Sequence, residues 1–82
     1  MAKERTIYEK LFFKIYNHVD AMMCCYRDKD LLRNHTNYGA ATAYATMMLD
    51  IGFDVDLRVY ADGDYLITDK ITINGKDYDF FH

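Results

Sequence analysis

The sequence contains no proline and no tryptophan, and its only cysteines, Cys24 and Cys25, are adjacent. Neighbouring cysteines can bridge each other only through a strained ring, which excludes a disulfide framework and fits a reducing compartment. No apolar run approaches the roughly 20 residues that cross a bilayer, and the charged first ten residues do not have the pattern of a signal peptide. These absences predict a cytoplasmic protein without a membrane segment.

The composition is that of a folded domain, because 51% of the residues are hydrophobic and 28% are charged. Disordered chains combine low hydrophobicity with a high net charge, which is only −3 in this sequence. A chain of 82 residues buries roughly 60% of the surface that its unfolded form exposes, which suffices for one core. We therefore predict a single domain over residues 1–82.

Charge is distributed unevenly along the chain. Residues 1–52 hold seven Lys and Arg residues against six Asp and Glu residues. Residues 53–82 hold three basic residues against seven aspartates. The C-terminal part is therefore acidic, which disfavours attraction to nucleic acids or to an anionic membrane.

Two amphipathic helices are predicted in the first 52 residues. From about Thr6 to Arg27, apolar residues recur at intervals of three or four, the spacing of one helix face. This stripe consists of Ile7, Leu11, Ile15, Val19, Met22 and Tyr26. The second helix is expected to begin near Asn34, Thr36 or Asn37, which are frequent N-cap residues, and to end at Gly52.

From Phe53 onward the apolar period changes to two, which indicates strands. Asn74-Gly75 predicts a type I′ hairpin turn that places Ile71 opposite Tyr78. A three-residue loop over 62–64 then keeps one face apolar, with Val59 opposite Ile67 and Val55 opposite Ile71. The predicted fold is an α+β domain, two helices followed by a three-stranded antiparallel β-meander, with both helices on one face of the sheet.

This pairing assigns each strand residue to an inner or an outer face. The inner face is predicted to hold Phe53, Val55, Leu57, Val59, Ile67, Ile71, Ile73, Tyr78 and Phe80. The outer face is predicted to hold Asp54, Asp56, Arg58, Tyr60, Leu66, Thr68, Lys70, Thr72, Asp77 and Asp79, with Lys70 between Asp56 and Asp79. Asp69 falls on the inner face, where an unpaired carboxylate is costly. It is expected to lie near water at the sheet end, to pair with His18 or Lys14, or to mark a bulge.

Catalytic and metal-binding patterns are weak. His18 and Cys25 share a helix face but are about 10.5 Å apart along the axis, which is too far for a base to activate a thiol. The predicted state of both cysteines is therefore buried and inert. The spacings of His18, His35, His82 and the cysteines match no zinc motif, and the Asp-rich segments lack the calcium-loop pattern. No enzyme activity, cofactor or metal is expected.

Protein binding is the predicted function. The outer sheet face offers Asp54, Asp56, Asp77 and Asp79 to a basic partner, with Tyr60 as an aromatic anchor. A second surface is predicted on the first helix, where Phe13 and Tyr16 fall opposite the core stripe.

Size and charge are compatible with an inhibitor or accessory protein of a phage or mobile element. The alternative hypothesis is a nucleic-acid-binding regulator that uses the basic flank of the first helix, formed by Lys3, Lys10, Lys14 and Asn17. The acidic strand half makes nucleic acid the less favoured partner, and a homodimer is left open.

Overall fold

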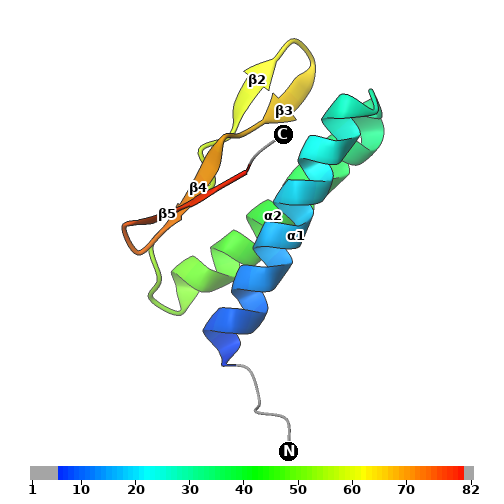
Figure 1. Cartoon of the computed structure of the whole chain (residues 1–82). Coiled ribbons are helices and arrows are strands. Elements are labelled where there is room, and N and C mark those ends of the chain that lie inside the picture. The colour runs from blue at the N-terminus through cyan, green and yellow to red at the C-terminus, as the bar shows by residue number, and fades with distance from the viewer. Residues whose placement is uncertain (1–5, 81–82) are drawn as a thin grey trace, which may run out of the picture.

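The computed structural model describes residues 6–80 and contains two helices and five short strands. The helices are α1, Ile7–Arg27, and α2, Leu31–Asp50. The strands are β1, Val55–Asp56; β2, Tyr60–Asp62; β3, Tyr65–Ile67; β4, Lys70–Ile73; and β5, Lys76–Asp79. Figure 1 shows the helices side by side as one layer and the strands as the other. The α+β class is confirmed, whereas the single three-stranded meander is not.

Helix α1 begins where the sequence predicts. The Thr6 hydroxyl accepts a hydrogen bond from the Glu9 N–H at 3.1 Å, and the Glu9 carboxylate accepts one from the Thr6 N–H at 3.3 Å. This reciprocal capping box satisfies two N–H groups that the helix leaves without partners. Four residues of the predicted stripe, Leu11, Ile15, Val19 and Met22, are buried in the core, whereas Ile7 at the start of the helix is 58% exposed.

Helix α2 begins earlier than predicted. Its N-cap is Asp30, whose carboxylate accepts a hydrogen bond from the Arg33 N–H, so the predicted starts near 34–37 are wrong. Lys29 makes the sharp turn with a φ of 58°, which lets the chain reverse within three residues. The first two residues of α2, Leu31 and Leu32, are 41% and 78% exposed.

The predicted end of α2 at Gly52 is confirmed. Gly52 has a φ of 101°, and its N–H donates to the Leu49 carbonyl at 3.1 Å. The Phe53 N–H donates to the Met48 carbonyl at 3.0 Å. These two bonds form the Schellman motif, which satisfies the last carbonyls of the helix.

The β4–β5 hairpin has the predicted register. Ile71 lies opposite Tyr78, and Asn74 and Gly75 have φ values of 51° and 80°, as a type I′ turn requires. Strand β1 pairs with the other edge of β4, giving the order β1-β4-β5. In that pairing Val55 lies opposite Ile73, so the predicted pairing of Val55 with Ile71 is wrong.

The remaining strands, β2 and β3, form a separate sheet because both long predicted strands are interrupted. Asp62 pairs with Tyr65 across a two-residue turn at Gly63-Asp64, so the predicted three-residue loop is wrong. Arg58, with a φ of 51°, interrupts the first long strand. This irregularity allows the two-residue turn without moving Val59 out of contact with the core.

The predicted inner face is confirmed, since all nine of its residues lie in the core or pack against it. Two residues assigned to the outer face are exceptions. Leu66 packs against the core, and Thr68 is only 1% exposed. Thr68 lies at the interruption between β3 and β4, and Leu66 is the middle residue of β3, which pairs with β2 in the separate sheet.

Candidate protein-binding surfaces

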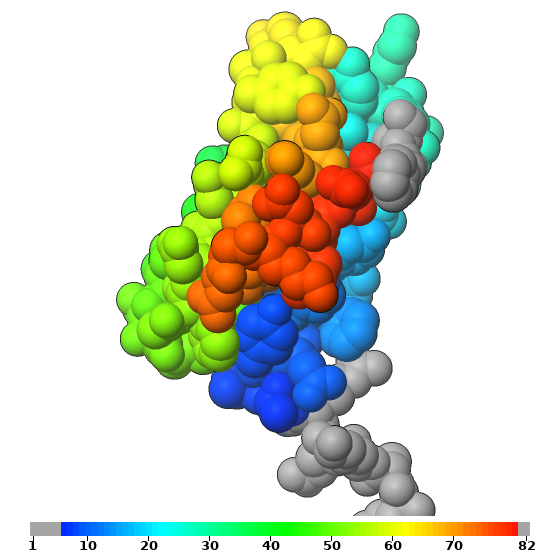
Figure 2. All heavy atoms as spheres, turned by 60° about the vertical axis from the view of Figure 1, so that its left-hand side comes forward, coloured from blue at the N-terminus to red at the C-terminus, as the bar shows by residue number. Residues whose placement is uncertain are grey.

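The outer face of the β1-β4-β5 sheet is not covered by either helix. Figure 2 shows this side of the molecule, with the strand segments, coloured from yellow-green to red, lying at the front. Four predicted site residues, Asp54, Asp56, Asp77 and Asp79, are exposed. We refer to this surface, together with Arg58, Lys70 and Thr72, as the outer face.

The two basic side chains of the outer face are held by internal contacts. The Lys70 ammonium lies 3.2 Å from a carboxylate oxygen of Asp77, and the Arg58 Nε donates to the Thr72 hydroxyl at 2.8 Å. The Thr72 hydroxyl donates in turn to Asp77 at 2.7 Å. The hydrogen bonds from Thr72 and Lys70 lower the pKa of Asp77 below its ordinary value.

The other three aspartates of the outer face form no ion pair among the described residues. Asp56 accepts a hydrogen bond from the backbone N–H of Arg58 at 2.9 Å, which fixes its carboxylate at the end of β1. Asp79 lies opposite Lys70, as predicted, but Asp56 lies opposite Thr72 because of the shifted β1 register. The predicted position of Lys70 between Asp56 and Asp79 is thus only half realised. The Lys70 ammonium forms its ion pair with Asp77.

Tyr60 does not belong to the outer face. It lies in β2, opposite Ile67, and its hydroxyl is 3.4 Å from a carboxylate oxygen of Asp69. Partial burial and the charge of Asp69 raise the pKa of Tyr60. Tyr60 is 48% exposed, so it remains available for contact, but the interruption at Arg58 separates it from Asp54 and Asp56.

Asp69 is exposed at the interruption between β3 and β4. Its predicted placement on the inner face is wrong, and of the three predicted alternatives its exposure supports the one that places it near water. The Asp69 carbonyl accepts a hydrogen bond from the Phe80 N–H at 2.8 Å, so its backbone still continues the β4–β5 ladder.

The predicted aromatic surface on α1 is only partly exposed. Phe13 is 40% exposed. Tyr16 is half-buried and stacks on Phe80, with ring centroids 4.6 Å apart. The C-terminal end of the described chain therefore covers a residue that helical spacing had placed opposite the core. On the basic flank, Lys10, Lys14 and Asn17 are exposed, while Lys3 lies outside the described residues.

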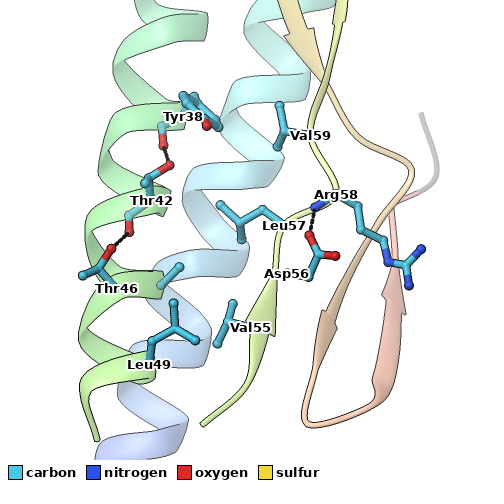
Figure 3. A pocket seen from close by; sticks show the side chains of 10 residues that line it. Tyr38, Thr42, Thr46, Leu49, Val55, Asp56, Leu57, Arg58 and Val59 are labelled. Atoms are coloured by element: carbon cyan, nitrogen blue, oxygen red, sulfur yellow. Dashed lines mark hydrogen bonds between the residues drawn. The ribbon is translucent and has the colours of Figure 1, made fainter. Parts of the chain in front are cut away.

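A groove of about 310 Å³ runs between α2 and the segment 55–59, as Figure 3 shows. Val55, Leu57 and Val59 point toward α2, whereas Asp56 and Arg58 point away from it. On the helix side, the Thr42 and Thr46 hydroxyls donate to carbonyls one turn earlier in α2. The groove is formed by packing between distant segments, and no local sequence pattern predicts it.

The thiol of Cys25 is not arranged as a nucleophile. The Asn37 side-chain nitrogen donates to the Cys25 sulfur at 3.9 Å, and the Asn37 side-chain oxygen lies 3.0 Å from the His18 ring. Desolvation and the neighbouring Asp30 carboxylate raise the pKa of Cys25, which favours the unreactive thiol. Cys24 and Cys25 are free and half-buried rather than fully buried as predicted.

Within 6–80, no group of three or more His, Cys, Asp or Glu side chains is placed to hold a metal ion. Neither α1 nor α2 combines the length and the apolar character of a membrane-crossing helix. Comparison of the chain with protein-family models, curated proteins and solved structures found no significant match.

Proposed function

We propose that this domain is a small non-enzymatic protein-binding module whose outer face contacts a basic surface on its partner. One observation carries the proposal. The outer face exposes four aspartates, while its two basic residues, Arg58 and Lys70, are engaged with Thr72 and Asp77. Arg58 keeps its positive charge, so the outer face carries four carboxylates against two basic groups and has a net negative charge.

Charge of one sign on a face speeds the encounter with an oppositely charged partner and makes the association sensitive to salt. Hydrogen bonds orient two of the four carboxylates, those of Asp56 and Asp77. A domain of this kind would act as an inhibitor or accessory protein by covering a basic groove on its target.

The proposal is tested by capture from a lysate of the source organism, with and without nuclease. The wild-type chain is compared with Asp54→Asn/Asp56→Asn and with the control Asp28→Asn/Asp64→Asn, which changes net charge equally away from the outer face. We expect a basic protein to be retained by the wild type and the control in the presence of nuclease. The outer-face variant should bind that protein at least tenfold more weakly, in titrations with the purified partner.

Equal binding by both double variants would contradict the assignment of the outer face. If the chain retains nucleic acid and nuclease treatment abolishes that retention, the result would instead support the alternative, nucleic-acid binding by the basic flank of α1.

A further inference from the structure

Strand β1 is an edge of the three-stranded sheet, and one of its sides has no neighbouring strand among the described residues. Its other side pairs with β4, where the Asp54 carbonyl accepts a hydrogen bond from the Asn74 N–H at 2.8 Å. Hydrogen-bonded and non-bonded pairs alternate along an antiparallel ladder, and Val55 is the residue that follows Asp54. The N–H and C=O of Val55 therefore point away from β4, toward the unpaired side.

The unpaired side of β1 borders the groove of about 310 Å³ that runs beside α2. Figure 3 shows α2 on one side of the segment 55–59 and the other strands of the sheet on its opposite side. On the α2 wall of the groove, Thr42, Thr46 and Leu49 are exposed. The groove thus combines peptide groups that can pair with a strand and side chains that can contact the residues of that strand.

The wall that β1 and its extension contribute is fixed by internal contacts. The Thr68 hydroxyl lies 2.9 Å from the Leu57 carbonyl oxygen and 3.1 Å from the Arg58 carbonyl oxygen. These contacts hold the segment where Arg58 has a φ of 51°, a conformation that a non-glycine residue adopts only under constraint. An edge that is fixed in advance loses less conformational freedom when a segment binds to it.

Charge determines what can occupy the groove. Asp54 and Asp56 flank Val55 in sequence and are exposed on the outer face. Arg58 points away from α2, and its Nε donates to the Thr72 hydroxyl. A second copy of the chain that paired antiparallel through the same edge would place Asp54 opposite Asp56, which is a repulsive contact. The edge therefore favours a basic segment of a different protein.

We infer that the groove binds an extended segment of the partner protein, which joins β1 as an antiparallel strand and carries a basic, an apolar and a basic residue in succession. The apolar residue lies opposite Val55, exchanges both main-chain hydrogen bonds with it and directs its side chain between β1 and α2. Its two neighbours point to the opposite face, where Lys or Arg lies beside Asp54 and Asp56. This inference rests on the proposed function, because the carboxylates of the outer face select the basic residues.

Three peptides test the inference on the purified chain by nuclear magnetic resonance titration. The first is acetyl-Thr-Lys-Val-Lys-Thr-amide, which should bind and shift the amide resonances of Val55 and Leu57. The second has N-methylvaline at its centre and so lacks the central N–H donor. The third, acetyl-Lys-Thr-Val-Thr-Lys-amide, has the same composition but directs its lysines toward the groove. The second and third peptides should each bind at least tenfold more weakly than the first.

Two results would overturn the inference. One is an unchanged Val55 amide resonance at millimolar concentrations of the first peptide. The other is equal affinity for the N-methylated peptide, which would show that no strand pairing occurs. Equal affinity for the third peptide would overturn the order of basic and apolar residues.

A matched pair of threonine variants tests the position of the bound segment. Thr46→Arg places a bulky cation on the groove wall, whereas Thr36→Arg makes the same change at an exposed position of α2 outside the groove. Both hydroxyls donate to a carbonyl one turn earlier in α2, so the two substitutions remove the same contact. Thr46→Arg should weaken binding of the first peptide at least tenfold, and Thr36→Arg less than twofold. Equal affinities for the two variants would contradict binding in the groove.

The same variants separate this inference from the proposed function. A purified partner might bind Asp54→Asn/Asp56→Asn weakly but bind Thr46→Arg and Thr36→Arg equally well. That result would support the outer face and overturn the groove. A partner weakened only by Thr46→Arg would contradict the outer face, and with it the basic residues of the inferred segment.

Discussion

The side-chain amide of Asn34 pairs with the backbone of Leu66 as a neighbouring β-strand would. Its nitrogen donates to the Leu66 carbonyl at 2.9 Å, and its oxygen accepts from the Leu66 N–H at 2.8 Å. The same nitrogen donates to the Met22 carbonyl at 2.9 Å. One fully buried side chain of α2 therefore links α1, α2 and β3.

Replacing Asn34 with Leu should lower the free energy of unfolding by roughly 2 to 4 kcal/mol, since three buried or partly buried backbone groups lose their partner. Urea denaturation followed by circular dichroism measures the change. The control is Thr36→Ala at an exposed position of the same helix, with an expected cost under about 0.5 kcal/mol. Similar costs for the two variants would show that the Asn34 amide does not hold the layers together.

Thr68 has a comparable role at the interruption of the strands. Its hydroxyl lies within 3.1 Å of the carbonyl oxygens of Leu57, Arg58 and Lys70. Thr68→Val keeps the shape but removes the donor, and we expect it to lower the free energy of unfolding by roughly 1 to 3 kcal/mol. Thr68→Ser, which keeps the hydroxyl, should cost less than Thr68→Val when both are measured by urea denaturation. The reverse order would show that packing, rather than hydrogen bonding, fixes this residue.

The sequence predicts those parts of the fold that depend on local pattern. Helix α1, the Gly52 terminus and the Asn74-Gly75 turn all follow from periodicity, capping and turn residues close together in the chain. The inner face is also predictable, because an apolar residue at every second position remains visible on both sides of an interruption.

The interruptions themselves were not predictable from local pattern. Thr68 looks like an ordinary outward strand residue, and its buried role depends on carbonyls about ten residues earlier in the chain. Asn34 is a good N-cap residue by type, but the nearby Asp30 caps α2, which leaves Asn34 to bind β3. The candidate site was affected in the same way, since exposure alternates through Tyr60 as expected, but local pattern does not show that Arg58 interrupts the strand before it.

Asp77 should make stability depend on pH in the acidic range. Hydrogen bonds from Thr72 and Lys70 hold the pKa of Asp77 below its ordinary value of 3.8. A carboxyl group with a lowered pKa in the folded state stabilises the fold above its ordinary pKa, and this contribution is lost as pH falls through the lowered value. The difference in the free energy of unfolding between wild type and Asp77→Asn should therefore be constant near neutral pH and shrink below about pH 4.

Thr72→Val provides the matched test of the cause, because the Thr72 hydroxyl makes the largest contribution to the lowered pKa of Asp77. In that background the pH-dependent difference should become smaller. An unchanged pH dependence would show that Thr72 does not set the pKa of Asp77.

The two aromatic residues predicted as a surface on α1 should respond differently to truncation. Tyr16 stacks on Phe80 and is half-buried, so Tyr16→Ala should lower the free energy of unfolding by roughly 1 to 3 kcal/mol. Phe13→Ala, at a residue that is 40% exposed, should cost under about 1 kcal/mol. Thermal and urea denaturation measure both effects. A binding defect in Tyr16→Ala therefore reports on the fold as well as the surface, whereas a defect in a fully folded Phe13→Ala variant would move the interface from the outer face to α1.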